Sequence, residues 1–480
     1  MRLQDLIKEL KPEKVIGKTD LIIADVVKDC SAVTEDSLFI AIKGESSDGH
    51  DYVKNAESYG AVAVICEREL DVGITQIIVK DSRIAMCITA SVFYGHPERK
   101  LSVVGVTGTN GKTTTAFMIY SVLNAENIPC GFIGTIGVYY GDTVKEPTLT
   151  TPDPIDLYST FAEMAEHGVK TVVMEVSAHA VYFNKIYGVR FKVGVFTNFS
   201  QDHLDFFKSM EEYKKQKIRF FTDYKPKCSV INSDDEFGRE ILKKAGNCVT
   251  YGLYNPSDVF AIKIKEKKDG LSFVLNLFDN VYEIKTKVYG KFNAYNVMAC
   301  ATACLFLGLS VEAVAKRLFE LKTVDGRIEK VYDGDYAVYV DYAHTPDGLK
   351  KVLSALKKIS DGNVISLFGC GGNRDKDKRE KMGEISGRYS DFTVITSDNP
   401  RYEDPMDIIF DIEKGVLKET KKYVLIQDRK EAIKYAISLA NKGDIVLIAG
   451  KGAEKYQEVL GVKRPYNDKE AVKEIVATLK

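Results

Sequence analysis

The sequence predicts an α/β fold divided among three domains. The chain has 480 residues, and a prior of roughly 150 residues per domain suggests about three. Apolar, β-branched stretches alternate with amphipathic helical stretches, which is typical of largely parallel sheets covered by helices. A glycine-rich turn with the sequence TGTNGKTTT, residues 107–115, stands between one such strand and one such helix. These three observations together predict the fold class.

The first domain is expected to span residues 1–98. Short apolar runs bounded by polar turns predict strands at residues 38–42, 61–66 and 76–79, and helical periodicity predicts a helix at 52–59.

The second domain is expected to span residues 99–328 and to hold a parallel sheet. Its strands are predicted at residues 101–106, 171–175, 193–197 and 228–232, and its first helix at 116–123. Backbone N–H groups and the helix dipole converge on phosphate oxygens where a strand, a glycine-rich turn and a helix N-terminus meet. Val106 stands where the strict G-x-x-x-x-G-K-[ST] pattern has its first glycine. The strand–helix context still favours a P-loop ATPase-type domain that binds a nucleotide triphosphate.

The predicted nucleotide contacts follow from this loop. Lys112 would reach the β- and γ-phosphates, and the Thr113 hydroxyl would take a Mg²⁺ position. The other loop residues predicted to bind ATP are Gly108, Thr109, Asn110, Gly111 and Thr114.

The third domain, residues 329–480, is predicted to be Rossmann-like. Its strands are expected at residues 337–341, 364–368, 392–396 and 445–449, followed by polar, glycine-rich loops where open α/β sheets place their ligands. A dehydrogenase is disfavoured because Arg374 replaces the last glycine of the G-x-G-x-x-G fingerprint.

Two further polar groups follow strands of the second domain. Glu175 ends an apolar strand, where a carboxylate would suit the Mg²⁺ of a nucleotide site, although alone such a residue is usually a solvated edge residue. The cluster around His203 must be a turn or a site, because such groups are costly to bury unpaired. The lysine-rich run 213–217 would by itself be a solvated helix face.

Composition excludes several classes of protein. A net charge of −1 gives no electrostatic footprint for nucleic acid or anionic membrane. No apolar run approaches the roughly 20 residues of a membrane-spanning helix, and Asp5 and Glu9 interrupt the place of a signal peptide. We therefore expect a cytoplasmic protein that acts on small molecules. A monomer is also expected, although neither charge nor composition specifies the oligomeric state.

The ordered motifs of the chain resemble those of the Mur ligases of peptidoglycan synthesis. They are TGTNGKTT from Thr107, LTTPDP from Leu149, MEVSAHA from Met174, TNFSQDHLD from Thr197, YKKQK from Tyr213, GKFNAYN from Gly290, VDGRIE from Val324, DYAHTPD from Asp341, GCGGNRDKDKR from Gly369, SDNPRYEDP from Ser397 and GKGAEKYQ from Gly450. Within the family, the third-domain motifs resemble members that add the third residue of the peptide. The resemblance implies an ATP-dependent amide ligase that joins meso-diaminopimelate to UDP-N-acetylmuramoyl-L-alanyl-D-glutamate through an acyl phosphate.

The resemblance also implies roles for individual residues. Lys112, Glu175, His203 and Lys217 would be catalytic, and Thr113, Glu175, His203 and Lys217 would serve Mg²⁺, with Lys217 carbamylated to N6-carboxylysine. Asn293, Arg327 and Asp341 would face ATP. The UDP-muramoyl dipeptide would contact Cys30, Thr150, Thr151, Ser177 and Lys185. Diaminopimelate would contact Arg374, Asp398, Asn399, Pro400, Arg401, Gly450 and Glu454.

Three positions depart from the family pattern. Asp29-Cys30-Ser31 stands where the family has Asp-Ser-Arg, Lys185 where it usually has Arg, and Ala453 where it has His. The first two departures fall where the resemblance implies contact with the UDP-sugar, and at Lys185 a lysine cannot reproduce a bidentate arginine.

The identity of the added amino acid depends on Arg401. The guanidinium would grip the distal carboxylate that distinguishes meso-diaminopimelate from L-lysine. A buried arginine without this carboxylate would be an unpaired charge, which predicts that lysine is refused. The alternatives are a lysine-adding ligase of the same family and a non-catalytic, nucleotide-dependent binding module.

Overall fold

The computed structural model describes residues 1–44 and 47–478. The chain forms two compact units. The first comprises Met1–Gly105, Asn127–Gly194 and Gln216–Lys227, and the second comprises Val106–Glu126, Val195–Lys215 and Cys228–Lys480. The division passes through strands β6 (Ser102–Thr107) and β11 (Phe191–Phe196) and helix α8 (Met210–Thr222). The predicted domain limits after residues 98 and 328 stay predictions.

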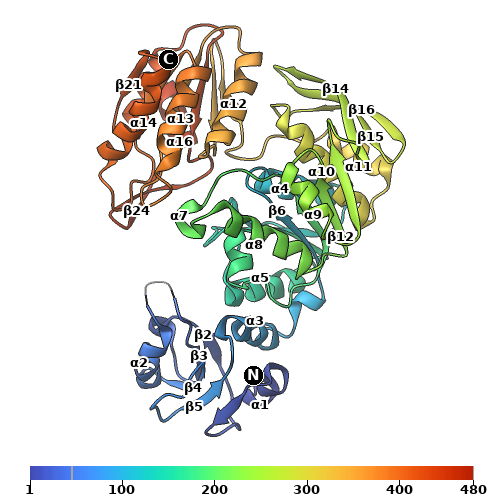
Figure 1. Ribbon diagram of the computed structural model, residues 1–480, viewed down its shortest axis with the longest axis vertical. Helices are drawn as coiled ribbons and strands as arrows, with labels where there is room; N and C mark the ends of the chain where they lie inside the picture. The colour runs from blue at the N-terminus through green and yellow to red at the C-terminus, as the bar shows by residue number, and fades with distance from the viewer. Residues whose placement is uncertain (45–46, 479–480) are drawn as a thin grey trace. The chain divides into compact units, whose positions relative to one another are not determined.

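The N-terminal part of the first unit is a five-stranded sheet in the order β1-β5-β4-β3-β2. These strands are β1 (Lys14–Ile16), β2 (Asp25–Val27), β3 (Ser37–Ile40), β4 (Ala61–Cys66) and β5 (Thr75–Ile78). Side chains alternate along β3: Leu38 and Ile40 pack with helices α1 (Leu3–Leu10) and α3 (Ser82–Phe93), whereas Phe39 packs with α2 (Val53–Ser58). The period of two along a strand therefore places helices on both faces of this sheet (Figure 1).

The remainder of the first unit contributes strands β7 (Cys130–Gly134), β8 (Gly137–Tyr140), β9 (Thr143–Lys145) and β10 (Thr171–Glu175) and helices α5 (Pro154–Glu166) and α6 (Ala178–Tyr182). β10 runs parallel to β7, and β8 and β9 continue as antiparallel neighbours. Glu175 is the last residue of β10, as predicted.

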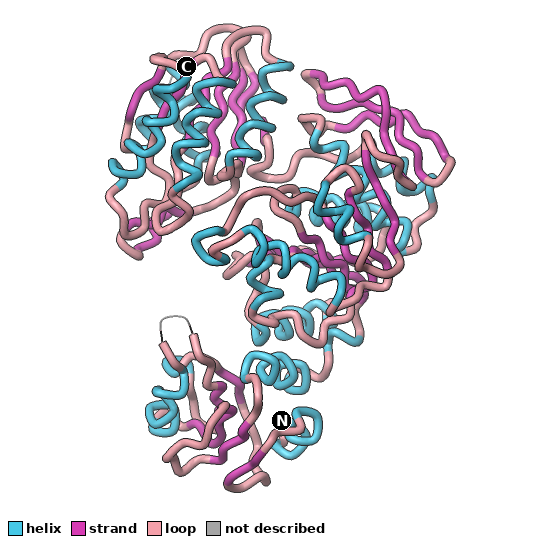
Figure 2. Tube along the Cα trace, viewed as in Figure 1, coloured by secondary structure: helices cyan, strands magenta, loops and turns pink. Residues whose placement is uncertain are grey.

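The second unit contains a run of strands that changes from parallel to antiparallel. These strands are β12 (Cys228–Asn232), β13 (Cys248–Gly252), β14 (Val259–Lys267), β15 (Gly270–Leu277) and β16 (Asn280–Thr286). β12, β13 and β14 are parallel, whereas β14, β15 and β16 form an antiparallel meander (Figure 2). The expectation of a largely parallel sheet missed this meander. Its last turn consists of Phe278 and Asp279, both with positive φ, without the Asn-Gly pair typical of such turns.

Four helices accompany these strands in the second unit: α4 (Lys112–Ala125), α9 (Glu236–Leu242), α10 (Phe292–Leu307) and α11 (Val311–Leu318). Helix α10 packs against α4 and also against β12, β13 and β14. The helix that follows the phosphate loop is therefore held by a long buried helix of the same unit.

The C-terminal part of the second unit is a six-stranded sheet in the order β17-β18-β22-β19-β20-β21. The strands are β17 (Glu329–Asp333), β18 (Ala337–Asp341), β19 (Val364–Phe368), β20 (Phe392–Ile395), β21 (Tyr423–Leu425) and β22 (Ile445–Ala449), and all except β17 are parallel. The loops after these parallel strands consequently meet at one edge of the sheet.

Helices cover both faces of this C-terminal sheet. Helices α12 (Pro346–Ile359), α13 (Asp377–Tyr389) and α14 (Pro405–Glu419) share a buried core with one face, and α15 (Arg429–Ser438) and α16 (Asp468–Thr478) share another with the opposite face. A hairpin of β23 (Tyr456–Val459) and β24 (Val462–Pro465) follows β22. Over residues 1–44 and 47–478, no helix combines the length and apolarity needed to cross a membrane.

Candidate active site

The phosphate loop joins β6 to α4, and two of its glycines are required by its geometry. Helix α4 begins at Lys112, directly after Gly111 and four residues before the predicted start. Gly108 and Gly111 have φ values of +150° and +83°. A Cβ atom at Gly108 would collide with the Thr197 hydroxyl, and one at Gly111 would lie 2.6 Å from Asn296 Oδ1. The loop therefore keeps the tight backbone path that exposes N–H groups to an anion.

Two residues that were not among the predicted site residues hold this loop in place. The Thr197 hydroxyl and the Asn198 Nδ2 donate to the Asn110 carbonyl at 2.7 and 2.9 Å, and Asn198 Oδ1 accepts from the Asn110 N–H at 2.9 Å. Both residues directly follow β11. Part of the TNFSQDHLD cluster thus supports the phosphate loop.

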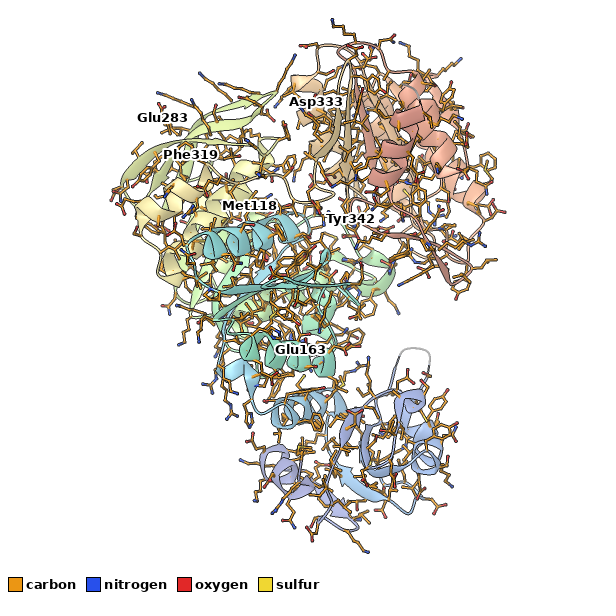
Figure 3. The ribbon with its side chains drawn as sticks, turned by 180° about the vertical axis from the view of Figure 1, so that it is seen from behind. Met118, Glu163, Glu283, Phe319, Asp333 and Tyr342 are labelled. Atoms are coloured by element: carbon orange, nitrogen blue, oxygen red, sulfur yellow. The ribbon has the colours of Figure 1, made fainter. Side chains whose placement is uncertain are left out.

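Two cationic side chains of the predicted nucleotide site, Lys112 and Arg327, lie against the loop and the start of α4. Lys112 Nζ donates to the carbonyls of Gly108 and Thr109 at 3.0 and 2.9 Å. Arg327 Nη2 donates to the Thr113 hydroxyl at 2.9 Å, although the two residues are 214 positions apart. The Arg327 guanidinium also lies over the ring of Tyr342, at 4.3 Å from its centroid. Tyr342 directly follows β18 (Figure 3).

Asp341 is placed differently from a simple nucleotide ligand. Its two carboxylate oxygens accept from the backbone N–H groups of Ile328 and Ala343, both at 2.7 Å. Burial raises the pKa of Asp341 to about 6, against the effects of Arg327 and of the two N–H groups. The carboxylate therefore ties the end of β18 to the segment before β17, and its contact with ATP stays a prediction.

Asn293 is linked to the phosphate-loop helix α4 by hydrogen bonds that pass through the side chain of Asn296. Asn296 Nδ2 donates to Asn293 Oδ1 at 2.7 Å, and Asn296 Oδ1 accepts from the Thr115 hydroxyl at 3.2 Å. Asn296 belongs to the GKFNAYN motif, and its separation of three from Asn293 on one helix could have indicated this contact.

Glu175 provides a buried oxygen of the kind that a cation binds. The side chain is fully buried, and Oε1 accepts from the Thr135 N–H at 2.8 Å. Among the described residues, Oε2 finds no hydrogen-bond partner. Because a buried carboxylate oxygen is costly to leave unpaired, Glu175 fits the role of a Mg²⁺ ligand.

The predicted metal ligands are divided between the two units: Glu175 and Lys217 belong to the first, Thr113 and His203 to the second. Lys217 lies on α8 with 1% of its surface exposed. His203 has a left-handed backbone conformation, and its Nε2 lies 3.4 Å from Asp202 Oδ2. His203 and His344 hold the pKa of Asp202 well below its usual range, against the effect of burial.

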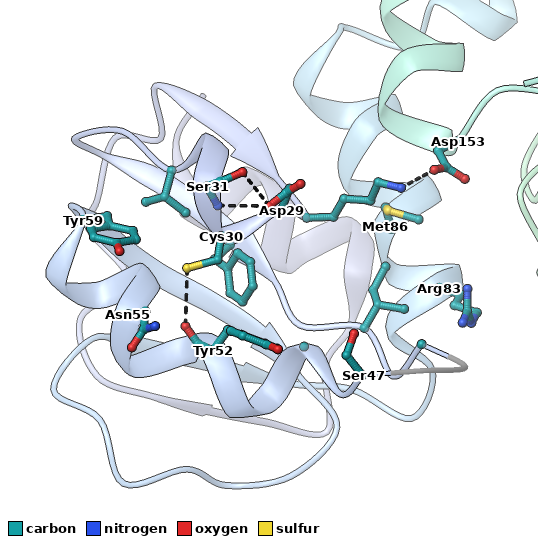
Figure 4. A pocket seen from close by; sticks show the side chains of 16 residues that line it. Asp29, Cys30, Ser31, Ser47, Tyr52, Asn55, Tyr59, Arg83, Met86 and Asp153 are labelled. Carbon is teal, nitrogen blue, oxygen red and sulfur yellow. Dashed lines mark hydrogen bonds and ion pairs between the residues drawn. The ribbon is translucent and has the colours of Figure 1, made fainter. Parts of the chain in front are cut away.

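The first unit contains a cavity of about 1040 Å³. Cys30 and Tyr52 line it, and Cys30 Sγ lies 3.7 Å from the Tyr52 carbonyl (Figure 4). Burial raises the pKa of the Cys30 thiol, and the Asp29 carboxylate adds to this effect. The structure therefore places the Asp-Cys-Ser departure in the wall of a cavity large enough for a nucleotide-sized ligand.

Two lysines share one aspartate at the edge of this cavity. Lys185 Nζ lies 2.7 Å from Asp153 Oδ1, and Lys28 pairs with Asp153 Oδ2. Lys185 and Lys28 hold the pKa of Asp153 below its usual value although burial opposes this. Lys28 and Asp153 were not predicted as site residues; Asp153 stands inside the LTTPDP motif and could have been chosen from it.

The predicted contacts next to Glu175 form a small network. The Thr151 hydroxyl donates to the Glu175 carbonyl at 2.8 Å and accepts from the Ser177 N–H at 3.0 Å. The Thr150 hydroxyl lies 3.1 Å from that of Thr135. Thr150, Thr151 and Ser177 are thus brought together around the end of β10.

The predicted amino-acid contacts gather at the carboxyl edge of the C-terminal sheet. Asp398 and Asn399 follow β20, and Gly450, with φ of +111°, follows β22. Asn399 Nδ2 donates to Glu454 Oε2 at 3.0 Å, which joins the two loops. Arg374, on the loop after β19, lies 3.5 Å from Asp205 at the start of helix α7 (Leu204–Phe207).

The charged groups of this site already have counterions within the chain. Arg401 Nη1 donates to the Gly372 carbonyl at 2.9 Å, and its Nε lies 3.4 Å from Glu458 Oε2. The fully buried Lys451 donates to Glu454 Oε2 at 2.9 Å. Arg401 is 21% exposed and paired. The expectation that it would be a buried, unpaired charge without diaminopimelate is therefore wrong.

Three family models match the chain: "Mur ligase family, catalytic domain" over residues 23–102, "Mur ligase middle domain" over 106–304, and "Mur ligase, glutamate ligase domain" over 326–452. A UDP-N-acetylmuramoyl-L-alanyl-D-glutamate--2,6-diaminopimelate ligase of Caldanaerobacter subterraneus is 44% identical over 99% of both chains. The chain belongs to the Mur ligase family. UDP-N-acetylmuramoyl-L-alanyl-D-glutamate--2,6-diaminopimelate ligase 1 of Clostridium acetobutylicum is 42% identical over the whole of both chains. A solved structure of a ligase with this name has a TM-score of 0.71 and 29% identity, and covers 100% of this chain and 99% of the other.

The resemblance and the fold class predicted for this Mur ligase are thus confirmed. The predicted UDP-muramoyl residues all lie in the first unit, and the predicted nucleotide and amino-acid residues all lie in the second. Their individual roles stay predictions.

Proposed function

We propose that this Mur ligase adds meso-diaminopimelate to UDP-N-acetylmuramoyl-L-alanyl-D-glutamate and that this amide formation converts ATP to ADP and phosphate. The observation that carries the proposal is its full-length similarity to relatives named for this reaction. The loops that carry Arg401 and Glu454 meet, because Asn399 of the first donates to Glu454 of the second. Arg401 would bind the distal carboxylate of diaminopimelate, and Glu454 would bind the ammonium group beside that carboxylate.

The reaction must activate a carboxylate that is inert to an amine. The γ-phosphoryl group passes from ATP to the D-glutamyl carboxylate, so that one O–P bond forms while the bond to ADP breaks. The deprotonated amine of diaminopimelate then attacks the acyl carbon, and phosphate leaves. Positioning and charge stabilisation dominate such chemistry. Lys112 and the N–H groups of the phosphate loop would stabilise the transferring phosphoryl group, and Arg327 would contribute a second cation beside Thr113.

Thr113, Glu175, His203 and Lys217 are the residues proposed to hold Mg²⁺. When bound, Mg²⁺ neutralises phosphate oxygens. The unpaired Oε2 of Glu175 supports this role. Lys217 would serve as a carbamate, formed when its neutral amine adds CO₂ and loses a proton, because the carbamate supplies the oxygen ligand that Mg²⁺ prefers.

A phosphate-release assay tests the proposal. Purified protein receives ATP, Mg²⁺ and the UDP-muramoyl dipeptide, and candidate amino acids are added one at a time. Release that depends on meso-diaminopimelate and on the dipeptide is the expected result. Equal release with L-lysine would favour the lysine-adding alternative, and nucleotide binding without release under any combination would favour a non-catalytic module.

A further inference from the structure

The amino-acid site contains a carboxylate placed where the substrate's distal carboxylate is expected. Glu458 lies on β23, and its Oε2 is 3.4 Å from Arg401 Nε. The backbone holds the two residues together, because the Arg401 N–H donates to the Glu458 carbonyl at 3.2 Å. The Glu458 N–H in turn donates to Asn399 Oδ1 at 2.9 Å. Glu458 is therefore a fixed neighbour of Arg401.

We propose that Glu458 is a specificity-determining residue whose carboxylate competes with the distal carboxylate of diaminopimelate for Arg401. The proposal rests on the proposed function. A guanidinium attracts either carboxylate, but two carboxylates on one guanidinium repel each other. Diaminopimelate must therefore displace Glu458 from Arg401 or share the guanidinium with it.

The same pair decides what happens when lysine binds. Lysine has no distal carboxylate, so Glu458 remains on Arg401 and the guanidinium keeps its counterion. The penalty of an unpaired charge, which would otherwise exclude lysine, is reduced. Glu458 thus lowers the affinity for diaminopimelate and narrows its advantage over lysine.

The second ion pair of this site, between Lys451 and Glu454, is held more firmly than the pair between Arg401 and Glu458. Lys451 is fully buried and donates both to Asn399 Oδ1 at 3.0 Å and to Glu454 Oε2 at 2.9 Å. Glu458 is 19% exposed and meets Arg401 through a single ion pair. We therefore expect the substrate to replace the internal partner in the Arg401–Glu458 ion pair. The Lys451–Glu454 ion pair should stay intact.

The test measures KM and kcat for meso-diaminopimelate and for L-lysine in the wild type and in Glu458→Gln. A partly exposed ion pair contributes up to about 1 kcal/mol, so KM for diaminopimelate should fall roughly two- to fivefold in the variant. The fall in KM should exceed any change in kcat, and the ratio of kcat/KM for diaminopimelate over lysine should rise. The difference between the proteins should shrink at high salt.

Glu470→Gln is the matched control, because Glu470 lies in the same domain but is exposed and pairs with Lys473. It should match the wild type throughout. If Glu458→Gln has an unchanged or raised KM for diaminopimelate, with normal KM values for ATP and the dipeptide and a normal Tm, then Glu458 does not compete with the substrate for Arg401. Wild-type enzyme that fails to use diaminopimelate would instead overturn the proposed function.

Discussion

Removing one partner of the buried ion pair between Arg429 and Asp468 should strongly destabilise the C-terminal sheet. Both side chains are fully buried. Arg429 Nε and Nη2 donate to the two carboxylate oxygens of Asp468 at 2.7 and 2.8 Å. Nη2 also donates to the Ala449 carbonyl at 3.0 Å, and Nη1 to that of Ser397 at 3.4 Å. Burial opposes the charge, but Asp468 raises the pKa of Arg429 overall.

Replacing Arg429 by methionine would leave the Asp468 carboxylate buried without its partner. Breaking such a pair costs about 3–5 kcal/mol. At roughly 2–4 °C per kcal/mol for a domain of this size, the corresponding Tm should fall by about 6–20 °C. Ala449 and Ser397 immediately precede Gly450 and Asp398 of the proposed amino-acid site, so KM for diaminopimelate should rise as well.

Calorimetric unfolding of three variants tests this reasoning. Lys430→Met is the matched control, because its pair with Glu474 is exposed to solvent and should contribute little to stability. The double variant Arg429→Met/Asp468→Leu removes both charges and should recover most of the lost stability. If Arg429→Met unfolds like the control, or if the double variant is no more stable than the single one, the account of the buried pair is refuted.

The remaining predictions concern the reaction and its pH dependence. Lys217→Ala should nearly abolish ligation, and acetate or formate should partly restore it by supplying an oxygen ligand; near wild-type turnover would contradict the carbamate. Lys112→Ala should also be inactive, through loss of phosphoryl stabilisation, and a rescue by acetate would argue against that role. Arg401→Ala should raise KM for diaminopimelate roughly ten- to hundredfold and reduce its advantage over lysine, with KM for ATP and the dipeptide as internal controls. The pKa of Asp341 is raised to about 6 in the folded state, so its contribution to stability is greatest below its unfolded value near 4 and is lost as pH rises through 6. Asp341→Asn should therefore remove part of the decline in unfolding free energy between pH 4 and 6.5, and an identical slope in both proteins would exclude the shift.

Local signals in the sequence determined the elements and the phosphate loop. Short runs of apolar and β-branched residues predicted β4, β10, β12, β18, β19 and β22 with the bounds that the structure has. The glycines of TGTNGKTTT occur where only glycine tolerates both the positive φ and the neighbouring side chain. Such features depend on a few adjacent residues, and they can be seen without knowledge of the fold.

Pairings between distant segments were decided only by the tertiary structure. The sequence did not indicate that Glu458 would form an ion pair with Arg401 or that Lys451 would form one with Glu454. It also did not indicate that the Asp341 carboxylate would accept a hydrogen bond from the Ile328 N–H. Each pairing depends on which loops meet at the edge of a parallel sheet, and that follows from strand order and not from strand composition. Charge is therefore visible in the sequence, whereas the partner of each charge is set by packing, and it is the partner that determines how tightly a ligand binds.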